Sequence, residues 1–147
     1  MAAERRGRWG RRSRWASLFG ALLLAVLACA GDRRARFDEA LDAYQHALRW
    51  GEVGVVASYL GDRPRQQLLA RGAAWRELRI VEVSLTRVDW LPSATVRVVA
   101  QVEWYGQRSG RLGATLLAQR WVDGATGWQL REQRVIGGTP LPVLTLP

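Results

Sequence analysis

Residues 95–104, Thr-Val-Arg-Val-Val-Ala-Gln-Val-Glu-Trp, alternate between apolar and polar side chains over almost their whole length. The apolar positions are Val96, Val98, Ala100, Val102 and Trp104, and the positions between them are polar apart from Val99. A period of two sends successive side chains to opposite faces of a strand. The stretch therefore predicts a half-buried β-strand with one face toward the core.

Similar patterns lie on both sides of this stretch. Residues 81–86 alternate in the same way, and further strands are expected between residues 110 and 123 and at residues 128–136. Short turn-forming segments separate the expected strands, at residues 91–93, 106–110 and 123–127. Because loops this short join antiparallel neighbours, the pattern predicts a four-stranded antiparallel sheet.

Helical periodicity precedes the strands. Between residues 36 and 50 an apolar stripe recurs at steps of four, three and four, formed by Phe37, Leu41, Tyr44 and Leu48. This spacing predicts one long helix that ends at Gly51. Residues 52–60 predict a short helix, and residues 65–70 predict one or two further turns. Helices followed by a meander of strands give the α+β class, with the N-terminal helices packed on a curved antiparallel sheet.

The order of these segments resembles a known family, the nuclear transport factor 2-like (cystatin-like) cone fold. The resemblance covers residues 36–136 and is carried by the sequences of residues 47–52, 55–60, 120–123 and 127–130. It implies an open cone of curved sheet closed by the first helices. Members of that family include isomerases, dehydratases, small-ligand binders and assembly modules, so the fold does not decide the function.

The N-terminus has the layout of a signal peptide. Six arginines and one glutamate lie within residues 1–14, and residues 15–31 carry no charge. The apolar core, residues 18–27, falls within the roughly 7–15 residues of a cleaved signal and is shorter than the roughly 20 that span a bilayer. We therefore expect residues 1–28 to be a signal helix that directs export.

Val26-Leu27-Ala28-Cys29 resembles the lipobox of bacterial lipoproteins. The resemblance implies cleavage between Ala28 and Cys29 and lipidation of Cys29 with palmitate-like acyl chains, although Leu27 departs from the small residue usual at its position. Residues 29–35 would then be the lipidated cysteine and its tether. Three alternatives remain open: cleavage after Ala30 by the A-x-A rule, an uncleaved anchor, and a twin-arginine signal at residues 11–15.

Lipidation would place the protein in the bacterial cell envelope. Ala30 after the cysteine favours the outer membrane, facing the periplasm, by resemblance to the lipoprotein sorting pattern. Loss of the signal removes six arginines and one glutamate, which lowers the formal net charge by five, from +9 to +4. The mature chain is thus only weakly basic, and we expect no nucleic-acid partner. The expected partners are the membrane and either an envelope protein or a small hydrophobic ligand.

The sequence offers little catalytic chemistry. One Cys and one His give no metal-binding motif, and no cofactor-binding motif is present, so we expect no cofactor and no metal. His46 is offset from the apolar stripe by about 200° at 100° per residue, which predicts a surface position. We expect Glu82 and Glu103 on the solvated face of the sheet, across from arginines such as Arg97.

Six tryptophans follow Cys29, and we expect them to serve mainly as core. A second hypothesis is that Tyr44, Trp104 and Trp121 line the cone and stack on a ligand. The Pro-containing tail, residues 137–147, is expected to be extended and to lie on the body. The function that follows is a non-catalytic binding or assembly module of the envelope. The alternative is a periplasmic isomerase- or cyclase-like enzyme of the same fold, with an acid inside the cone.

Overall fold

The computed structural model describes the backbone of residues 13–141 and 143, and the side chains of residues 32–141 and 143. The described elements are α1 (Ser13–Trp50), α2 (Val53–Ser58), α3 (Asp62–Ala70), α4 (Gly72–Arg76), β1 (Leu78–Leu91), β2 (Thr95–Gly106), β3 (Leu112–Gly124) and β4 (Gly127–Gly138). The chain divides into two compact units, Met1–Asp38 and Glu39–Pro147, and the boundary falls within α1. Among the described residues, no helix has both the length and the apolar character needed to cross a membrane.

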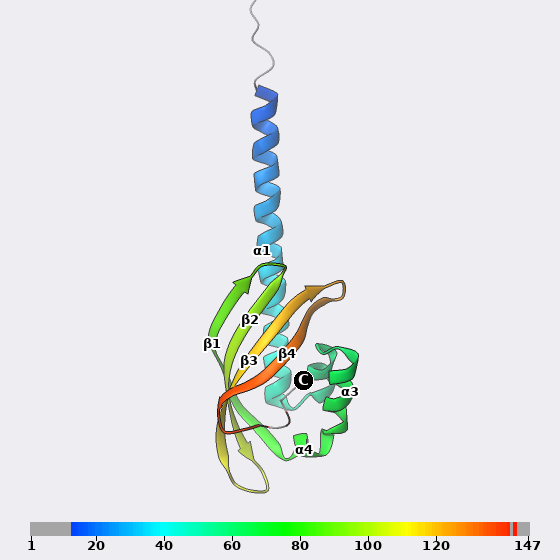
Figure 1. The fold of residues 1–147 in the computed structure, drawn as a ribbon, viewed down its shortest axis with the longest axis vertical. Helices are drawn as coiled ribbons and strands as arrows, with labels where there is room; N and C mark the ends of the chain where they lie inside the picture. The colour runs from blue at the N-terminus through cyan, green and yellow to red at the C-terminus, as the bar shows by residue number, and fades with distance from the viewer. Residues whose placement is uncertain (1–12, 142, 144–147) are drawn as a thin grey trace, which may run out of the picture. The chain divides into compact units, whose positions relative to one another are not determined.

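The four strands form one antiparallel sheet in the order β1-β2-β3-β4 (Figure 1). The strands curve, and the α2–α4 segment lies beside the β4 edge. At that edge the backbone N–H of Leu130 donates to the carbonyl of Tyr59 at 2.9 Å, and Leu60 forms a parallel bridge with Leu130. The predicted α+β architecture, helices followed by a curved four-stranded sheet, is confirmed.

The core follows the two periodicities of the sequence. The predicted helical stripe of α1 is buried, and so are the apolar positions of β2 from Val96 to Trp104. Leu141 and Val143 of the tail are also buried, whereas Gly137 and Gly138 belong to β4. Pro142 and residues 144–147 lie outside the described residues.

Several element boundaries differ from the expectations. The helix expected from residue 36 is the C-terminal part of α1, which begins at Ser13. The turns expected from residue 65 begin at Asp62, because Pro64 falls in the first turn of α3, where its missing N–H costs no intrahelical bond. Trp75 belongs to a short helix, α4, and not to the first strand.

Strand β1 departs most from the expected alternation. Register shifts lie between Ile80 and Glu82 and between Leu85 and Arg87, so the simple parity of residues 81–86 is broken. Glu82 lies opposite Glu103, and Arg97 lies opposite Asp89. The prediction that Glu82 and Glu103 face arginines such as Arg97 is therefore wrong, because the strand register pairs the two glutamates with each other. Both glutamates are solvent-exposed as expected.

Candidate functional site

The interior between the C-terminal part of α1 and the sheet is filled by an aromatic cluster. The cluster consists of Tyr44 from α1, Tyr59 from the turn after α2, and Trp121 from β3. The Tyr44 and Trp121 ring centroids lie 5.1 Å apart, and Tyr59 lies 5.8 Å from Tyr44 and 5.7 Å from Trp121. All three contacts are edge-on, the arrangement that aromatic quadrupoles favour. Tyr44 and Trp121 are sealed from solvent.

A chain of hydrogen bonds satisfies the polar atoms of this interior. The Tyr44 hydroxyl donates to Oε1 of Gln133 at 3.0 Å, and Nε2 of Gln119 donates to the same oxygen at 2.6 Å. Nε1 of Trp121 donates to Oε1 of Gln119 at 3.1 Å. Gln119 and Gln133 are buried on neighbouring strands, where they lie directly opposite each other. The interior network is therefore built from neutral groups.

Burial changes the acidity of the two tyrosines of the cluster. Burial raises the pKa of Tyr44 well above its ordinary value of 10.0, and the hydrogen bond with Gln133 offsets part of this rise. Burial also raises the pKa of Tyr59, with a further contribution from the negative charge of Glu39. Both phenols thus stay protonated at neutral pH, and the Tyr44 hydroxyl acts as a hydrogen-bond donor rather than as a base.

The three aromatic residues proposed as pocket lining do not gather in one place. Tyr44 and Trp121 meet in the cluster, whereas Trp104 contacts a separate group toward the other end of β2. Its Nε1 donates to Oγ1 of Thr115 at 2.9 Å, and the Thr115 hydroxyl donates to the carbonyl of Thr139 at 2.5 Å. The Trp104 ring packs closely over Gly113, where any Cβ would collide with it. Ala28 and Cys29, the predicted processing residues, lie outside the residues whose side chains are described.

The remaining tryptophans divide between core and surface. Trp75 and Trp128 are buried, and Trp90 is half-buried and packs edge-on against Trp128 at 5.9 Å. Trp50 is 59% exposed, so the expectation of a core role is wrong for this residue. Its ring lies near His46, with centroids 6.1 Å apart. His46 is exposed, as its offset from the stripe predicted.

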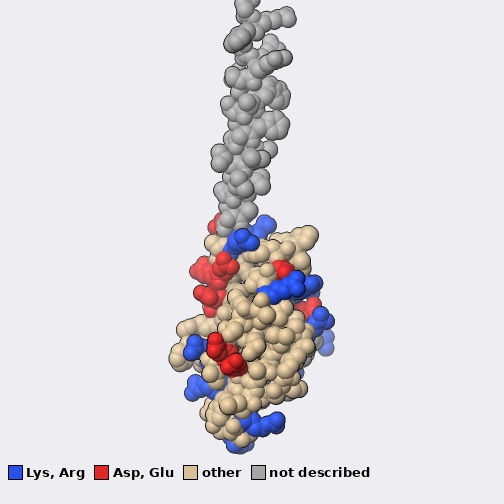
Figure 2. Space-filling view, turned by 90° about the vertical axis from the view of Figure 1, so that its left-hand side faces the viewer, with Lys and Arg blue, Asp and Glu red and all other residues tan. Residues whose placement is uncertain are grey.

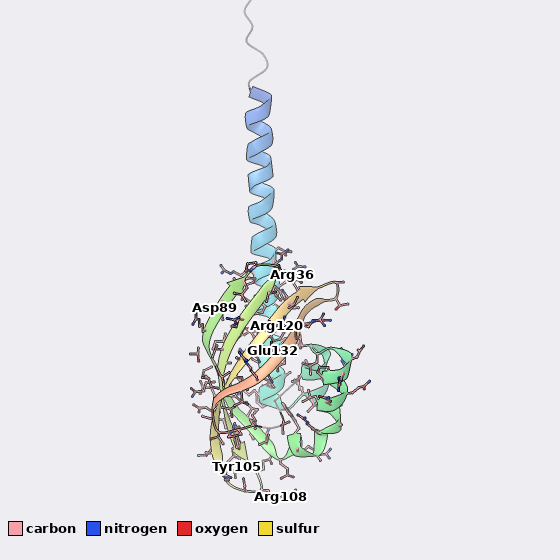
Figure 3. The ribbon with its side chains drawn as sticks, viewed as in Figure 1. Arg36, Asp89, Tyr105, Arg108, Arg120 and Glu132 are labelled. Atoms are coloured by element: carbon pink, nitrogen blue, oxygen red, sulfur yellow. The ribbon has the colours of Figure 1, made fainter. Side chains whose placement is uncertain are left out.

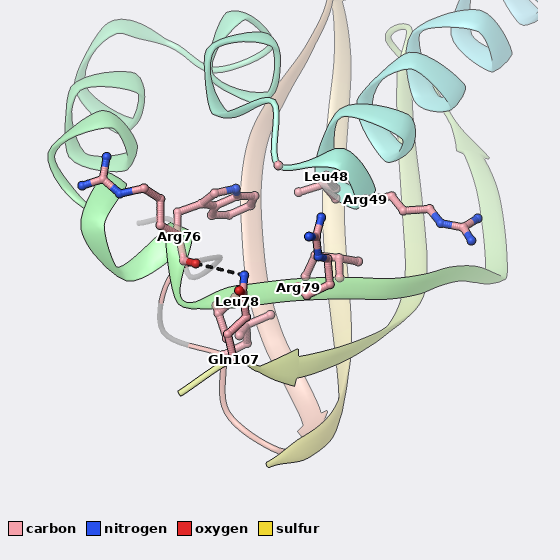
Figure 4. Close-up of a pocket in the computed structure, with 10 residues that line it drawn as sticks. Leu48, Arg49, Arg76, Leu78, Arg79 and Gln107 are labelled. Atoms are coloured by element: carbon pink, nitrogen blue, oxygen red, sulfur yellow. Dashed lines mark hydrogen bonds between the residues drawn. The ribbon is translucent and has the colours of Figure 1, made fainter. Parts of the chain in front are cut away.

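A small cavity of about 200 Å³ lies where the end of α1 meets α4 and the start of β1 (Figure 4). Its lining includes Leu48, Trp75 and Ile80, and Nε2 of Gln107 donates to the carbonyl of Arg76 at 3.1 Å beside it. In Figure 4 the guanidinium groups of Arg49 and Arg76 point away from each other. This volume is below the roughly 300–1,000 Å³ of ordinary small-molecule sites.

A larger, open groove of about 850 Å³ lies between the end of α1 and β1. Its walls are residues 42–50 of α1, including Ala43, His46 and Trp50, and residues 81–83 of β1. The Nε2 atom of Gln45, which also lines the groove, is buried without a hydrogen-bond partner. The alternation of the sequence carried no signal for this groove, because the groove arises from the packing of a helix against one edge of a sheet.

The convex face of the sheet carries ordinary surface charges (Figure 3). Arg120 and Glu132 lie opposite each other on β3 and β4 and form an ion pair at 3.2 Å. Arg108 in the β2–β3 turn pairs with Glu77 at 2.5 Å. Exposed pairs of this kind contribute about 0–1 kcal/mol each. In the part of the chain with described side chains, no group of three or more His, Cys, Asp or Glu residues is placed to hold a metal ion.

Comparison with solved structures gives the fold its class. A protein of unknown function from Nostoc punctiforme PCC 73102, described as having a cystatin-like fold, superimposes with a TM-score of 0.53. The alignment covers 76% of this chain and 95% of that chain at 10% sequence identity. The fold is cystatin-like. No family model and no curated protein matches the sequence, so the cystatin-like likeness concerns architecture alone.

Proposed function

We propose that this protein is a lipid-anchored, non-catalytic binding or assembly module of the bacterial cell envelope, facing the periplasm. The envelope part of the proposal rests on the signal-like N-terminus and on the lipobox-like sequence of residues 26–29. Several acyl chains on Cys29, at about 0.8 kcal/mol per buried CH₂, would hold the chain on the membrane almost permanently.

The observation that carries the non-catalytic part is the filled interior. A catalytic cone needs space for a substrate and an ionisable group inside it. Here the interior positions are occupied by the rings of Tyr44, Tyr59 and Trp121, and the Tyr44 hydroxyl is bound to the neutral amide of Gln133. The groove of about 850 Å³ along α1 and β1 is the surface on which we place the proposed partner.

Metabolic labelling with palmitate tests the anchor. The wild-type chain should incorporate label and sediment with membranes, whereas Cys29→Ala should incorporate none. Ala30→Gln is the matched control, because it blocks cleavage by the A-x-A rule and leaves the lipobox-like sequence unchanged. We expect Ala30→Gln to be labelled like the wild type. A wild-type chain without label would overturn the proposed anchor. An intact mass that corresponds to a chain starting at Met1 or at Gly31 would overturn it as well.

A further inference from the structure

Strand β1 forms an open edge of the sheet. It pairs with β2 on one side and, within the described residues, with no strand on the other. The opposite edge, β4, is in part covered by the Tyr59–Leu60 segment. An edge strand presents unpaired N–H and C=O groups that another strand can bind. The fourteen-residue β1 is therefore the part of the sheet most open to a partner strand.

The inner face of β1 is apolar but incompletely covered. Leu85 lies opposite Ala100, and Val88 lies opposite Val98. Ala100 and Val98 are 2% and 0% exposed, whereas Leu85 and Val88 are 47% and 39% exposed. Leu85 and Val88 thus stay partly exposed although their neighbours on β2 are buried. Leu85 and Val88 therefore leave apolar surface available to a partner.

The charges on the outer face of β1 are complementary to themselves. Their order along the strand is Arg79, Glu82, Ser84, Arg87 and Asp89, and Arg79 and Asp89 are equidistant in sequence from Ser84. If two copies pair antiparallel about Ser84, Arg79 faces Asp89 of the second copy, and Glu82 lies beside Arg87 of the second copy. Opposite charges across neighbouring strands stabilise such pairing, and like charges oppose it. Figure 2, which views the β1 side, shows basic and acidic groups on an otherwise uncharged surface. Within one copy, Arg87 and Asp89 form an ion pair at 2.8 Å.

The same register also matches the apolar surfaces. Leu85 of one copy comes opposite Val83 of the other, and Val88 comes opposite Ile80. Val83 lines the α1–β1 groove, whose opposite wall includes Trp50. One half of β1 thus supplies exposed apolar side chains, and the other half borders the groove that receives them. Because a two-fold axis relates the copies, each contact between the two halves of β1 occurs twice, as in any isologous interface.

We infer that two copies of this chain dimerise by antiparallel pairing of their β1 strands about Ser84, with Leu85 of each copy lying against the α1–β1 groove of the other. The inference goes beyond the proposed function, because it does not depend on the lipid anchor. The dimer would join two four-stranded sheets into one continuous sheet.

A cysteine at the two-fold axis tests the register. The experiment uses the full chain in detergent with the substitution Cys29→Ala, so that the introduced cysteine is the one thiol of the chain. Directly opposed antiparallel residues have Cα atoms about 4.5–5.5 Å apart, within the range that a disulfide spans. Ser84→Cys should therefore give a disulfide-linked dimer under mild oxidation at micromolar protein.

The matched control is Gln101→Cys, because Gln101 lies opposite Ser84 on β2, is also exposed and shares its face. We expect Gln101→Cys to stay monomeric on a non-reducing gel. A Ser84→Cys chain that stays monomeric would overturn the inference. Equal cross-linking of both variants would overturn it as well, because that result indicates contact through the face of the sheet.

Charge reversal tests the pairing independently of thiol chemistry. We expect the dissociation constant of the dimer to rise about tenfold in Arg79→Glu and in Asp89→Arg. Each substitution places like charges opposite each other, and the two-fold axis repeats this repulsion. The double variant Arg79→Glu/Asp89→Arg should return to within about threefold of the wild type, since it restores opposite charges across the axis. Sedimentation measures the dimer fraction, and far-UV circular dichroism checks the fold. A double variant as weak as its parents would contradict the register.

Discussion

Tyr44 shows how one residue serves both the core and a polar network. Its ring packs against Tyr59 and Trp121, and its hydroxyl reaches Gln133 across 89 positions of sequence. A buried hydroxyl left without a partner would cost about 1–3 kcal/mol. The two buried glutamines of β3 and β4 therefore allow a tyrosine, rather than a phenylalanine, at this position of the apolar stripe.

The raised pKa of Tyr44 predicts a specific loss of stability in alkali. The phenol ionises near pH 10 in the unfolded chain but at a higher pH in the folded chain, so stability is complete below pH 10 and falls above it. The chain contains no Lys, which leaves tyrosines as the main side chains that titrate in this range. We expect the free energy of unfolding to fall above pH 10 by at most about 1.4 kcal/mol per pH unit for each such group.

Urea denaturation between pH 8 and 11, followed by tryptophan fluorescence, measures this loss. Tyr44→Phe should flatten the decline and lower stability at pH 8 by about 1 kcal/mol through loss of the hydrogen bond. Tyr105→Phe is the control, because Tyr105 is exposed and its replacement should leave the decline unchanged. An identical pH profile for the wild type and Tyr44→Phe would show that Tyr44 does not govern this transition.

At the scale of elements, the short connections fix how neighbouring elements pack. Arg65 of α3 donates from Nε to the carbonyl of Ala57 at 3.0 Å and from Nη2 to the carbonyl of Leu60 at 3.3 Å, which fixes α3 against the end of α2.

The backbone of the β1–β2 turn has a less favourable conformation. Ser93 and Ala94 there have φ angles of 60° and 50°, in the left-handed region that side chains with a Cβ disfavour.

Ala94→Gly should therefore stabilise the protein. Glycine adopts a positive φ without the steric penalty of a Cβ, so we expect a gain of about 0.5–1.5 kcal/mol in the free energy of unfolding. Ala125→Gly in the β3–β4 turn is the control, because Ala125 is not among the residues with positive φ, and its replacement should be neutral or destabilising. Equal effects of the two substitutions in urea denaturation would contradict this account of the turn.

At the scale of the whole molecule, the core covers the central strands more fully than it covers the edge strand β1. The inward positions Val96, Val98 and Leu117 of β2 and β3 are fully buried, whereas Leu85 and Val88 of β1 are partly exposed. Among the described residues, the aromatic cluster thus fills the interior beside α1, and the β1 edge is left partly uncovered. The proposed assembly role therefore has a candidate location at the β1 edge.

Leu85→Ser should separate dimerisation from folding. Leu85 is already half-exposed in a single copy, so we expect a loss of at most about 1.5 kcal/mol in folding stability but a tenfold or greater weakening of the dimer. Ile136→Ser on β4 is the control, because Ile136 is 46% exposed and lies far from β1 in strand order. Sedimentation of both variants in detergent should show a monomeric Leu85→Ser and an unchanged Ile136→Ser. Equal weakening by the two would contradict a role for the β1 edge.

The sequence by itself determined the α+β class, the buried stripe of α1 and the inward face of β2, because these depend on periodicities of single elements. It also supplied the lipobox-like signal, which stays a prediction. Tertiary structure alone decided that Tyr44 and Trp121 meet while Trp104 lies apart, that Glu82 faces Glu103, and that β1 is the open edge. The physical reason is that a repeat of two or 3.6 residues specifies which face a side chain takes, whereas strand order and bulges specify what that face meets.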